Sequence, residues 1–523
     1  MRKVLIFLSI LFLVVACSSN KDSESDKAAE VSQVTFQAPL EVAEREFAAG
    51  EAMPQSAVAA PTNAPPQDMF FEDYGVNPFY DTADDHLSTF AMDVDTASYT
   101  LARSYLMSSQ MLPPSDAVRP EEFINFFDVD YPQPDGENAF AIHVDAAPAP
   151  FGYEGHYLMR VGIQGRSIAP EDRTPALLIF VIDVSGSMDM ENRLGLVKES
   201  LALLVDELRE DDRVGIVVYS DNTRIVLDPT PASEKETILD AIDALHPEGS
   251  TNAEAGIRLG YRLADEHKRD GQITRVILLS DGVANVGITG PDGILTQIQD
   301  SVDGGVTLST VGFGMGNYND VLMEQLANDG NGNYYYVDNL REARRVFVNN
   351  LTGTLQVIGF DAKVQVDFNP EVTDRYRLIG YENRAIADED FRDDSVDAGE
   401  IGAGHSVTAL YELALEGSTE SGVIATVVIR YQDAETREVV ELSQTLSTAD
   451  LMSRFEDAPA EFQLLAAVAE FAELLRESTW AEDGSYPDLM TVIAPLGEVY
   501  ANDTYVQEFI EMVRRAGRYV DQS

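Results

Sequence analysis

The chain has 523 residues, 45% of them hydrophobic, which is enough for about two to four domains with buried cores. Its 90 acidic residues outnumber 36 basic residues and give a formal net charge of −54. A surface this acidic repels phosphate backbones, which argues against DNA or RNA binding. The charge is typical of adaptation to salty surroundings, where self-repulsion is screened over about 8 Å or less.

The first residues have the features of a bacterial lipoprotein signal, and we expect residues 1–16 to be the signal peptide. Two basic residues precede an apolar run over residues 4–16 that is too short to span a bilayer. The run ends in "VVAC", which matches a lipobox, so we expect cleavage before Cys17 and lipidation of that residue. By resemblance to the lipoprotein sorting pattern, Ser18 favours the outer membrane of a Gram-negative cell. The alternative is an ordinary cleaved signal with an incidental cysteine.

Residues 17–67 are rich in Ala, Glu, Ser and Pro and show no sustained period, which predicts a disordered tether. Residues 68–170 are interpreted as an N-terminal flanking module. This segment predicts a helix over residues 98–107, a short helix at "RPEEFINFF", and paired strands at "AFAIHVDAAPAPF" and "GHYLMRVGIQGR".

Residues 174–352 show regular alternation of strands and helices. The strands "PALLIFVID", "RVGIVVYS", "RVILLSD", "VTLSTVGFG" and "NYYYVDN" are apolar throughout, and "TRIVLD" has the pattern of an edge strand. Strands without polar alternation are buried on both faces, so the segment predicts an α/β fold with a doubly wound, mostly parallel sheet covered by helices.

The remaining chain predicts two further regions. Five alternating strands over residues 355–447 indicate a β-rich, sandwich-like C-terminal module. Residues 448–523 form a helical region with helices at "PAEFQLLAAVAEFAELLRES" and "NDTYVQEFIEMVRRAGRYV". We expect the strands near residues 138–166 to join those of residues 355–447, which would leave the α/β domain inserted in one β-rich module.

Polar residues gather at predicted strand ends of the α/β domain. Asp183 ends the first strand and is followed by Ser185 and Ser187, Asp281 ends another strand, and Thr251 precedes a helix. Ligands of open α/β sheets bind at the carboxyl ends of the strands. Carboxylates and hydroxyls are hard oxygen ligands that suit Mg²⁺ and leave it at least one replaceable water. The alternative is that these residues only cap a helix and form turns.

These residues carry a family resemblance. "DVSGSM", Thr251 and "SDG" resemble the metal-ion-dependent adhesion site of von Willebrand factor type A domains, over residues 174–352. The resemblance implies a Rossmann-like fold in which Ser185, Ser187 and Thr251 bind Mg²⁺, or Mn²⁺ or Ca²⁺, through their hydroxyls. Asp183 and Asp281 would act directly or through water. The wider chain, over residues 70–520, resembles a bacterial lipoprotein family with "MDVDTASY" before the type A domain and "RLIGYENRAIADEDF" after it.

Four other motifs carry weaker signals. "GFGMG" has its third glycine one position too early for a dinucleotide site, so we expect no nucleotide binding. "DGNGNYYYVDN" lacks the glycine and the glutamate of a calcium loop and is interpreted as a turn. "DVDTASY" could hold a second cation, but helix capping by Asp95 or Thr96 is the preferred interpretation. "DEDFRDDSVDAGE" predicts a solvated loop, with calcium binding as the alternative.

We therefore expect a lipid-anchored envelope protein that binds a protein ligand through a divalent cation, with an Asp or Glu of the partner completing the metal shell. No serine-hydrolase elbow or metalloprotease histidine spacing occurs, so we expect no enzyme activity. The alternative is an envelope scaffold protein with a purely structural metal site. Because the chain is so acidic, an acidic partner would need a basic rim, or would bind more strongly at high salt.

Overall fold

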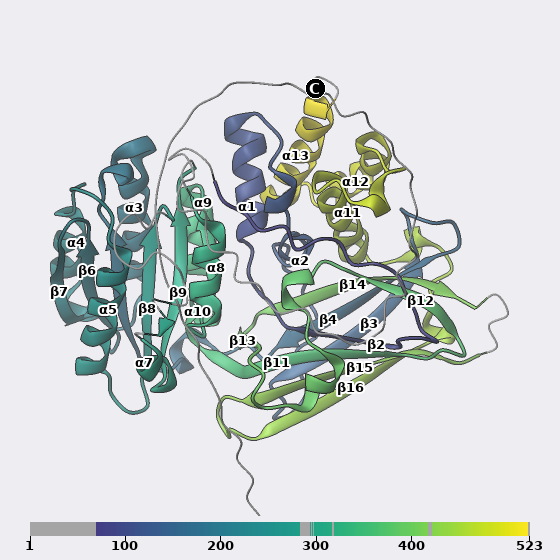
Figure 1. Ribbon diagram of the computed structural model, residues 1–523, viewed down its shortest axis with the longest axis horizontal. Helices are drawn as coiled ribbons and strands as arrows, with labels where there is room; N and C mark the ends of the chain where they lie inside the picture. Colours follow the sequence, from purple (N-terminus) through teal and green to yellow (C-terminus); the bar gives the residue numbers. More distant parts are fainter. Residues whose placement is uncertain are drawn as a thin grey trace, which may run out of the picture. The chain divides into compact units, whose positions relative to one another are not determined.

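The computed structural model describes residues 69–282, 298–315, 318–416 and 421–520, together with residues 293, 295 and 296 (Figure 1). The predicted signal peptide, Cys17 and the predicted tether lie outside these residues. Among the helices described, none combines the length and apolar character that crossing a bilayer demands.

The α/β domain is built on a six-stranded sheet in the order β10-β9-β8-β5-β6-β7. Its strands are β5 (Ala176–Asp183), β6 (Arg213–Tyr219), β7 (Thr223–Pro231), β8 (Ile273–Ser280), β9 (Val306–Phe313) and β10 (Tyr334–Val337). All neighbouring pairs are parallel except β6 and β7, so the predicted edge strand runs antiparallel. The α/β fold predicted from the apolar strands is confirmed.

Helices cover this sheet on both faces, because the side chains of a strand alternate between them. The helices described are α3 (Arg193–Glu207), α4 (Lys235–Asp243), α5 (Ala253–His267), α7 (Gln299–Asp303), α8 (Asp320–Asn328), α9 (Leu340–Arg344) and α10 (Leu351–Leu355). Phe180 of β5 belongs to one core together with Leu201 of α3. Val181, the next residue, belongs to the opposite core with Ile257 of α5. Gly260 lets α5 approach closely, since a Cβ there would lie 2.4 Å from Val181 Cγ2.

Two antiparallel sheets pack around a second core. Their strands are β1 (Tyr80–Asp81), β2 (Leu87–Ala91), β3 (Phe140–Pro148), β4 (Tyr157–Gly165), β11 (Val357–Phe368), β12 (Thr373–Ile379), β13 (Gly399–Gly402), β14 (Ser406–Leu415), β15 (Val423–Asp433) and β16 (Val439–Ser447). One sheet has the order β1-β12-β14-β4-β3, and the other has the order β13-β11-β15-β16 with β2 on β11. Because β14 pairs with β4, strands from before and after the α/β domain share one sheet.

A helical layer completes the described chain. Its helices are α1 (Ala97–Ser104), α2 (Pro120–Ile124), α11 (Ala460–Leu475), α12 (Tyr486–Val499) and α13 (Thr504–Val520). Tyr99, Phe123, Phe471 and Phe509 share one apolar core, so the helices near the N-terminus pack with those near the C-terminus. The helix predicted over residues 98–107 is present, as α1 followed directly by a π-helical turn over Tyr105–Ser109. Helix α12 was not predicted from the sequence, and its interior contains Pro495.

Candidate metal-binding site

Asp183 is held in place by both the loop that follows it and the neighbouring strand. Its Oδ1 accepts a hydrogen bond from the Ser185 backbone N–H at 2.7 Å. Its Oδ2 accepts a hydrogen bond from Ser280 Oγ, at the end of β8, at 3.2 Å. The side chain is fully buried. Asp183 therefore has a defined orientation at the carboxyl edge of the sheet, where the sequence predicts it.

Two loops supply the three hydroxyl groups. Ser185 Oγ and Ser187 Oγ lie 2.9 Å apart, and the chain then turns through a 3₁₀ segment over Gly186–Asn192 into α3. The Gly186 N–H donates to Gly249 O at 3.0 Å and brings the loop before α5 alongside. Thr251 lies in this loop and is only 1% exposed. The serines and the threonine thus come from adjacent loops at one edge of the sheet.

Asp281 follows β8 and makes an ion pair that the sequence analysis missed. Arg193 Nη1 donates to Asp281 Oδ2 at 2.8 Å, and both side chains are buried. Arg193 is the first residue of α3, where a cation faces the positive end of the helix dipole. A basic residue at this unfavourable position was a sign in the sequence that Arg193 makes a contact outside its own helix. The remaining oxygen, Asp281 Oδ1, is buried and has no hydrogen-bond partner within the part of the chain that the structure describes.

The electrostatics of this site fit a cation. Burial, and then the charge of Asp281, raise the pKa of Asp183 to about 7, although hydrogen bonds from Ser185 and Ser280 act in the opposite direction. Asp183 thus lies near a second buried carboxylate, Asp281, which pairs with Arg193 and keeps one oxygen without a hydrogen-bond partner among the described residues. Adjacent hydroxyls and carboxylates are the ligands that hard divalent ions prefer. The site has the donor set and the unbalanced charge that a Mg²⁺-type ion would match.

Comparison with known proteins identifies the domains. The family described as von Willebrand factor type A domain matches residues 178–349, and one described as von Willebrand factor matches residues 65–160. The family "Uncharacterized protein YfbK, C-terminal" matches residues 353–423 and 418–518. The protein YfbK of Escherichia coli (strain K12) is 36% identical over 479 residues, which cover 87% of this chain and 82% of YfbK. The chain belongs to the YfbK family of von Willebrand factor type A proteins.

Other similarities are confined to part of the chain or are distant. Inter-alpha-trypsin inhibitor heavy chain H3 of Mus musculus is 28% identical over 244 residues, covering 45% of this chain and 25% of the inhibitor chain. A solved structure titled von Willebrand factor type A from Catenulispora acidiphila is 14% identical, with a TM-score of 0.42 and coverage of 74% of this chain and 91% of that one.

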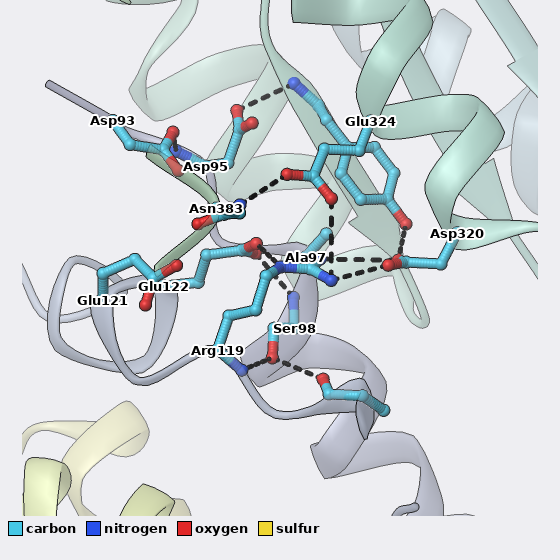
Figure 2. Close-up of polar contacts among 12 residues, drawn as sticks. Asp93, Asp95, Ala97, Ser98, Arg119, Glu121, Glu122, Asp320, Glu324 and Asn383 are labelled. Carbon is cyan, nitrogen blue, oxygen red and sulfur yellow. Dashed lines mark hydrogen bonds and ion pairs between the residues drawn. The ribbon is translucent and has the colours of Figure 1, made fainter. Parts of the chain in front are cut away.

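A buried ion network joins the type A domain to the flanking modules (Figure 2). Arg119, just before α2, donates from Nη1 to Asp320 Oδ2 of α8 at 2.6 Å and also pairs with Glu122. The Tyr334 hydroxyl donates to Asp320 Oδ1 at 2.6 Å. Ser98 at the start of α1 donates its N–H to Glu122 Oε2 at 2.7 Å. Helix α8 is therefore held by charged groups from the N-terminal module.

The motifs "MDVDTASY" and "RLIGYENRA" meet in the same network. Arg384 donates to Asp93 Oδ2 at 3.1 Å and to Asp95 Oδ2 at 3.2 Å. Asp95 Oδ1 also accepts from the Tyr334 N–H at 2.8 Å. The prediction that Asp95 or Thr96 caps the helix is wrong, because neither side chain bonds to the N-terminal N–H groups of α1. Asp95 pairs with Arg384 of the C-terminal module instead of capping the helix that follows it.

The network reaches the candidate metal-binding site through the backbone. The Asn319 N–H donates to Gly282 O at 3.3 Å, and Gly282 directly follows Asp281. Gly282 has a φ of +82°, and a Cβ there would lie 2.5 Å from the Tyr318 ring. The loop that carries Asp281 is thus packed against the residues that lead into α8.

Proposed function

We propose that the chain is a lipid-anchored protein of the cell envelope that binds a protein ligand through a divalent cation. Asp183, Ser185, Ser187, Thr251 and Asp281 would hold the ion, which we take to be Mg²⁺, with Mn²⁺ or Ca²⁺ as alternatives. The observation that carries the proposal is that Asp183 and Asp281 are buried close together, and that Oδ1 of Asp281 has no hydrogen-bond partner among the residues described.

The exposure of the residues around the proposed ion supports binding from outside. Asp183, Ser185, Thr251 and Asp281 are buried, whereas Ser187 is half-buried and the adjacent Gly186 is exposed. A Mg²⁺ ion prefers about six oxygen ligands and keeps several waters. An Asp or Glu of the partner would replace a water on this open side and complete the shell.

The charge of the chain constrains the partner. A net charge of −54 repels an acidic surface at long range. We therefore expect the donated carboxylate to lie within a basic rim, or the affinity to rise with ionic strength as screening removes the repulsion. The proposed activity is binding to a protein, not catalysis and not recognition of nucleic acid or nucleotide.

The proposed localisation depends on the N-terminal sequence. Lipidation of Cys17 would attach the chain to the envelope, and Ser18 favours the outer membrane of a Gram-negative cell. The predicted tether over residues 17–67 would separate the type A domain from the lipid surface.

An envelope scaffold with a structural metal is the second candidate. It is favoured by Arg193, which already balances one charge of the Asp183–Asp281 pair from within the domain. In that case the ion would stabilise the fold, and no partner group would be required.

Capture from envelope extract separates the two candidates. The bait is the processed chain in Mg²⁺ or in EDTA, compared with Asp183→Ala and with Asp189→Ala, an exposed aspartate in the same loop. Ligand binding predicts a specific partner that EDTA and Asp183→Ala each reduce by about tenfold or more, while Asp189→Ala retains it. If EDTA lowers only the melting temperature and leaves the captured proteins unchanged, the scaffold role is correct.

A further inference from the structure

A cavity of about 820 Å³ is lined by residues of the type A domain and of the antiparallel sheets. Asp329 and Asn331, from the loop between α8 and β10, contribute to its lining. So do three acids of the flanking module: Asp361 of β11, Asp397 just before β13, and Glu400 of β13. The cavity is separate from the Asp183 site, because none of these residues belongs to that site.

The three carboxylates of this second group converge. One oxygen from each of Asp361, Asp397 and Glu400 lies within 4.8 Å of the other two. Asp361 sits at a bulge in β11, where the register shifts against both β13 and β15, and its φ is +51°. Bulges redirect a side chain out of the regular strand alternation, and here the bulge places Asp361 beside the other two acids.

Glu400 indicates that this cluster is more than a group of solvated acids. Its side chain is 8% exposed, and in the described part of the chain its carboxylate has neither a hydrogen bond nor an ion pair. Burial, and then the charges of Asp397 and Asp361, raise its pKa well above the ordinary value, although Arg275 and Arg384 oppose this. A buried carboxylate without a partner is costly, and a bound cation removes that cost.

We propose that Asp361, Asp397 and Glu400 form a binding site for a Ca²⁺-type cation. Calcium takes six to eight oxygen ligands in flexible geometry and accepts carboxylates in monodentate or bidentate mode. Three carboxylates offer up to six oxygens, and water in the cavity can supply the rest. The described residues that line the cavity include no histidine or cysteine, so the ligand set is one for a hard ion.

Two motifs that each lack the full ligand set of a calcium loop contribute residues to this cavity. Asp329 and Asn331 come from "DGNGN", and Asp397 and Glu400 come from "DEDFRDDSVDAGE". The fold brings them to one cavity, where burial, then Asp361 and, to a smaller extent, the charge of Asp329 raise the pKa of Asp397 to about 6. Calcium at this site would therefore offset repulsion between a loop of the type A domain and the strands of the flanking module.

Calcium titration by calorimetry tests this site on the full processed chain. All proteins carry Asp183→Ala, which removes the separate site proposed at the sheet edge. We expect the parent to bind one Ca²⁺ and to melt at a higher temperature in Ca²⁺ than in EDTA. Adding Glu400→Gln should weaken binding by about tenfold or more and abolish the calcium-dependent rise in melting temperature. Glu389→Gln, the same change at an exposed position of the acidic segment, should leave both unchanged.

The proposal would be overturned if the Asp183→Ala parent bound no calcium, or if Glu400→Gln left the calcium affinity unchanged. Misfolding is controlled in EDTA, where Glu400→Gln should melt no lower than the parent because it removes a buried, unpartnered charge. Asp397→Asn provides the second variant, since this side chain is exposed and its substitution leaves the core intact. It must weaken calcium binding as well, and unchanged affinity in that variant counts against the site.

Discussion

Individual charges in the candidate metal-binding site are finely balanced. Asp183 and Asp281 are both buried, and Arg193 forms an ion pair with Asp281. Each ionised acid raises the cost of charging the other, so the pair needs positive charge from a side chain or from an ion. Arg193 provides part of it from within the fold, and a divalent ion would provide the rest.

Replacing Arg193 by Met should therefore have an effect that depends on metal. Removing one partner of a buried pair typically costs about 3–5 kcal/mol. We expect Arg193→Met to lower the free energy of unfolding by about 3 kcal/mol in EDTA and by clearly less in Mg²⁺, which would replace the lost positive charge. Urea unfolding in the two buffers checks this. An equal loss of unfolding free energy in EDTA and in Mg²⁺ would show that no ion binds next to these carboxylates.

Glu121 makes the stability depend on pH. Burial, and then the charge of Glu382, raise its pKa from 4.5 to about 8. Because the folded-state pKa is the higher one, the neutral acid favours folding below pH 4.5, and this contribution is lost as the pH rises towards 8. The melting temperature should fall by several degrees between pH 5 and pH 8, and Glu121→Gln should reduce that slope. The same slope in both proteins would contradict the assignment to Glu121.

For individual residues, the sequence predicted where the candidate ligands lie in the fold better than it predicted which distant side chains they contact. The five candidate ligands follow from strand ends and spacing, and the structure brings their loops to one edge of the sheet. Arg193 was missed because its contact with Asp281 spans 88 positions. Glu400 was treated as part of a solvated loop, yet it is buried, because composition alone does not reveal which acids of a run turn inwards.

Helix α8 is the element that links the modules. It carries Asp320 and Glu324, and both face Arg119 from the N-terminal module. Local sequence predicted this helix but not its contacts, since they depend on motifs more than 200 positions away. Helix α12 was missed for a different reason: Pro495 lacks an N–H donor and disfavours a helix interior, and packing in the C-terminal helical layer overrides that preference.

Breaking the contact between Arg119 and α8 should destabilise the chain strongly. We expect Arg119→Met to cost about 3–5 kcal/mol, because Glu122 and Asp320 would stay buried without their counter-charge. Arg454→Met is the matched control, since its pair with Asp457 is exposed and its loss should leave the free energy of unfolding nearly unchanged. Chemical unfolding measures both. Similar losses in the two variants would mean that the network does not join the modules.

At the scale of the whole molecule, the type A domain interrupts a sheet. Strand β14 lies between β12 and β4, and β4 precedes the type A domain in the chain. The sequence pattern predicted strands on both sides of the domain, but alternation does not specify which strands pair. The pairing comes from the shared core, where Val161 and Ile163 of β4 pack with residues such as Val364 of β11.

A fragment of residues 353–520 should therefore not fold alone. It lacks β3 and β4, so β14 would keep β12 but lose β4 on its other side, and the sandwich core would be exposed. We expect aggregation or an expanded state without cooperative thermal unfolding, measured by circular dichroism and light scattering. A monomeric fragment with a sharp melting transition would show that the N-terminal strands are dispensable.

Anomalous diffraction from a crystal of the chain grown with Mn²⁺ would show whether a divalent ion binds at the edge of the type A sheet. We expect an anomalous peak in contact with Ser185, Ser187 and Thr251, beside Asp183 and Asp281, with one coordination position open to solvent. The absence of a peak there, or a manganese ion enclosed entirely by ligands of its own chain, would contradict it.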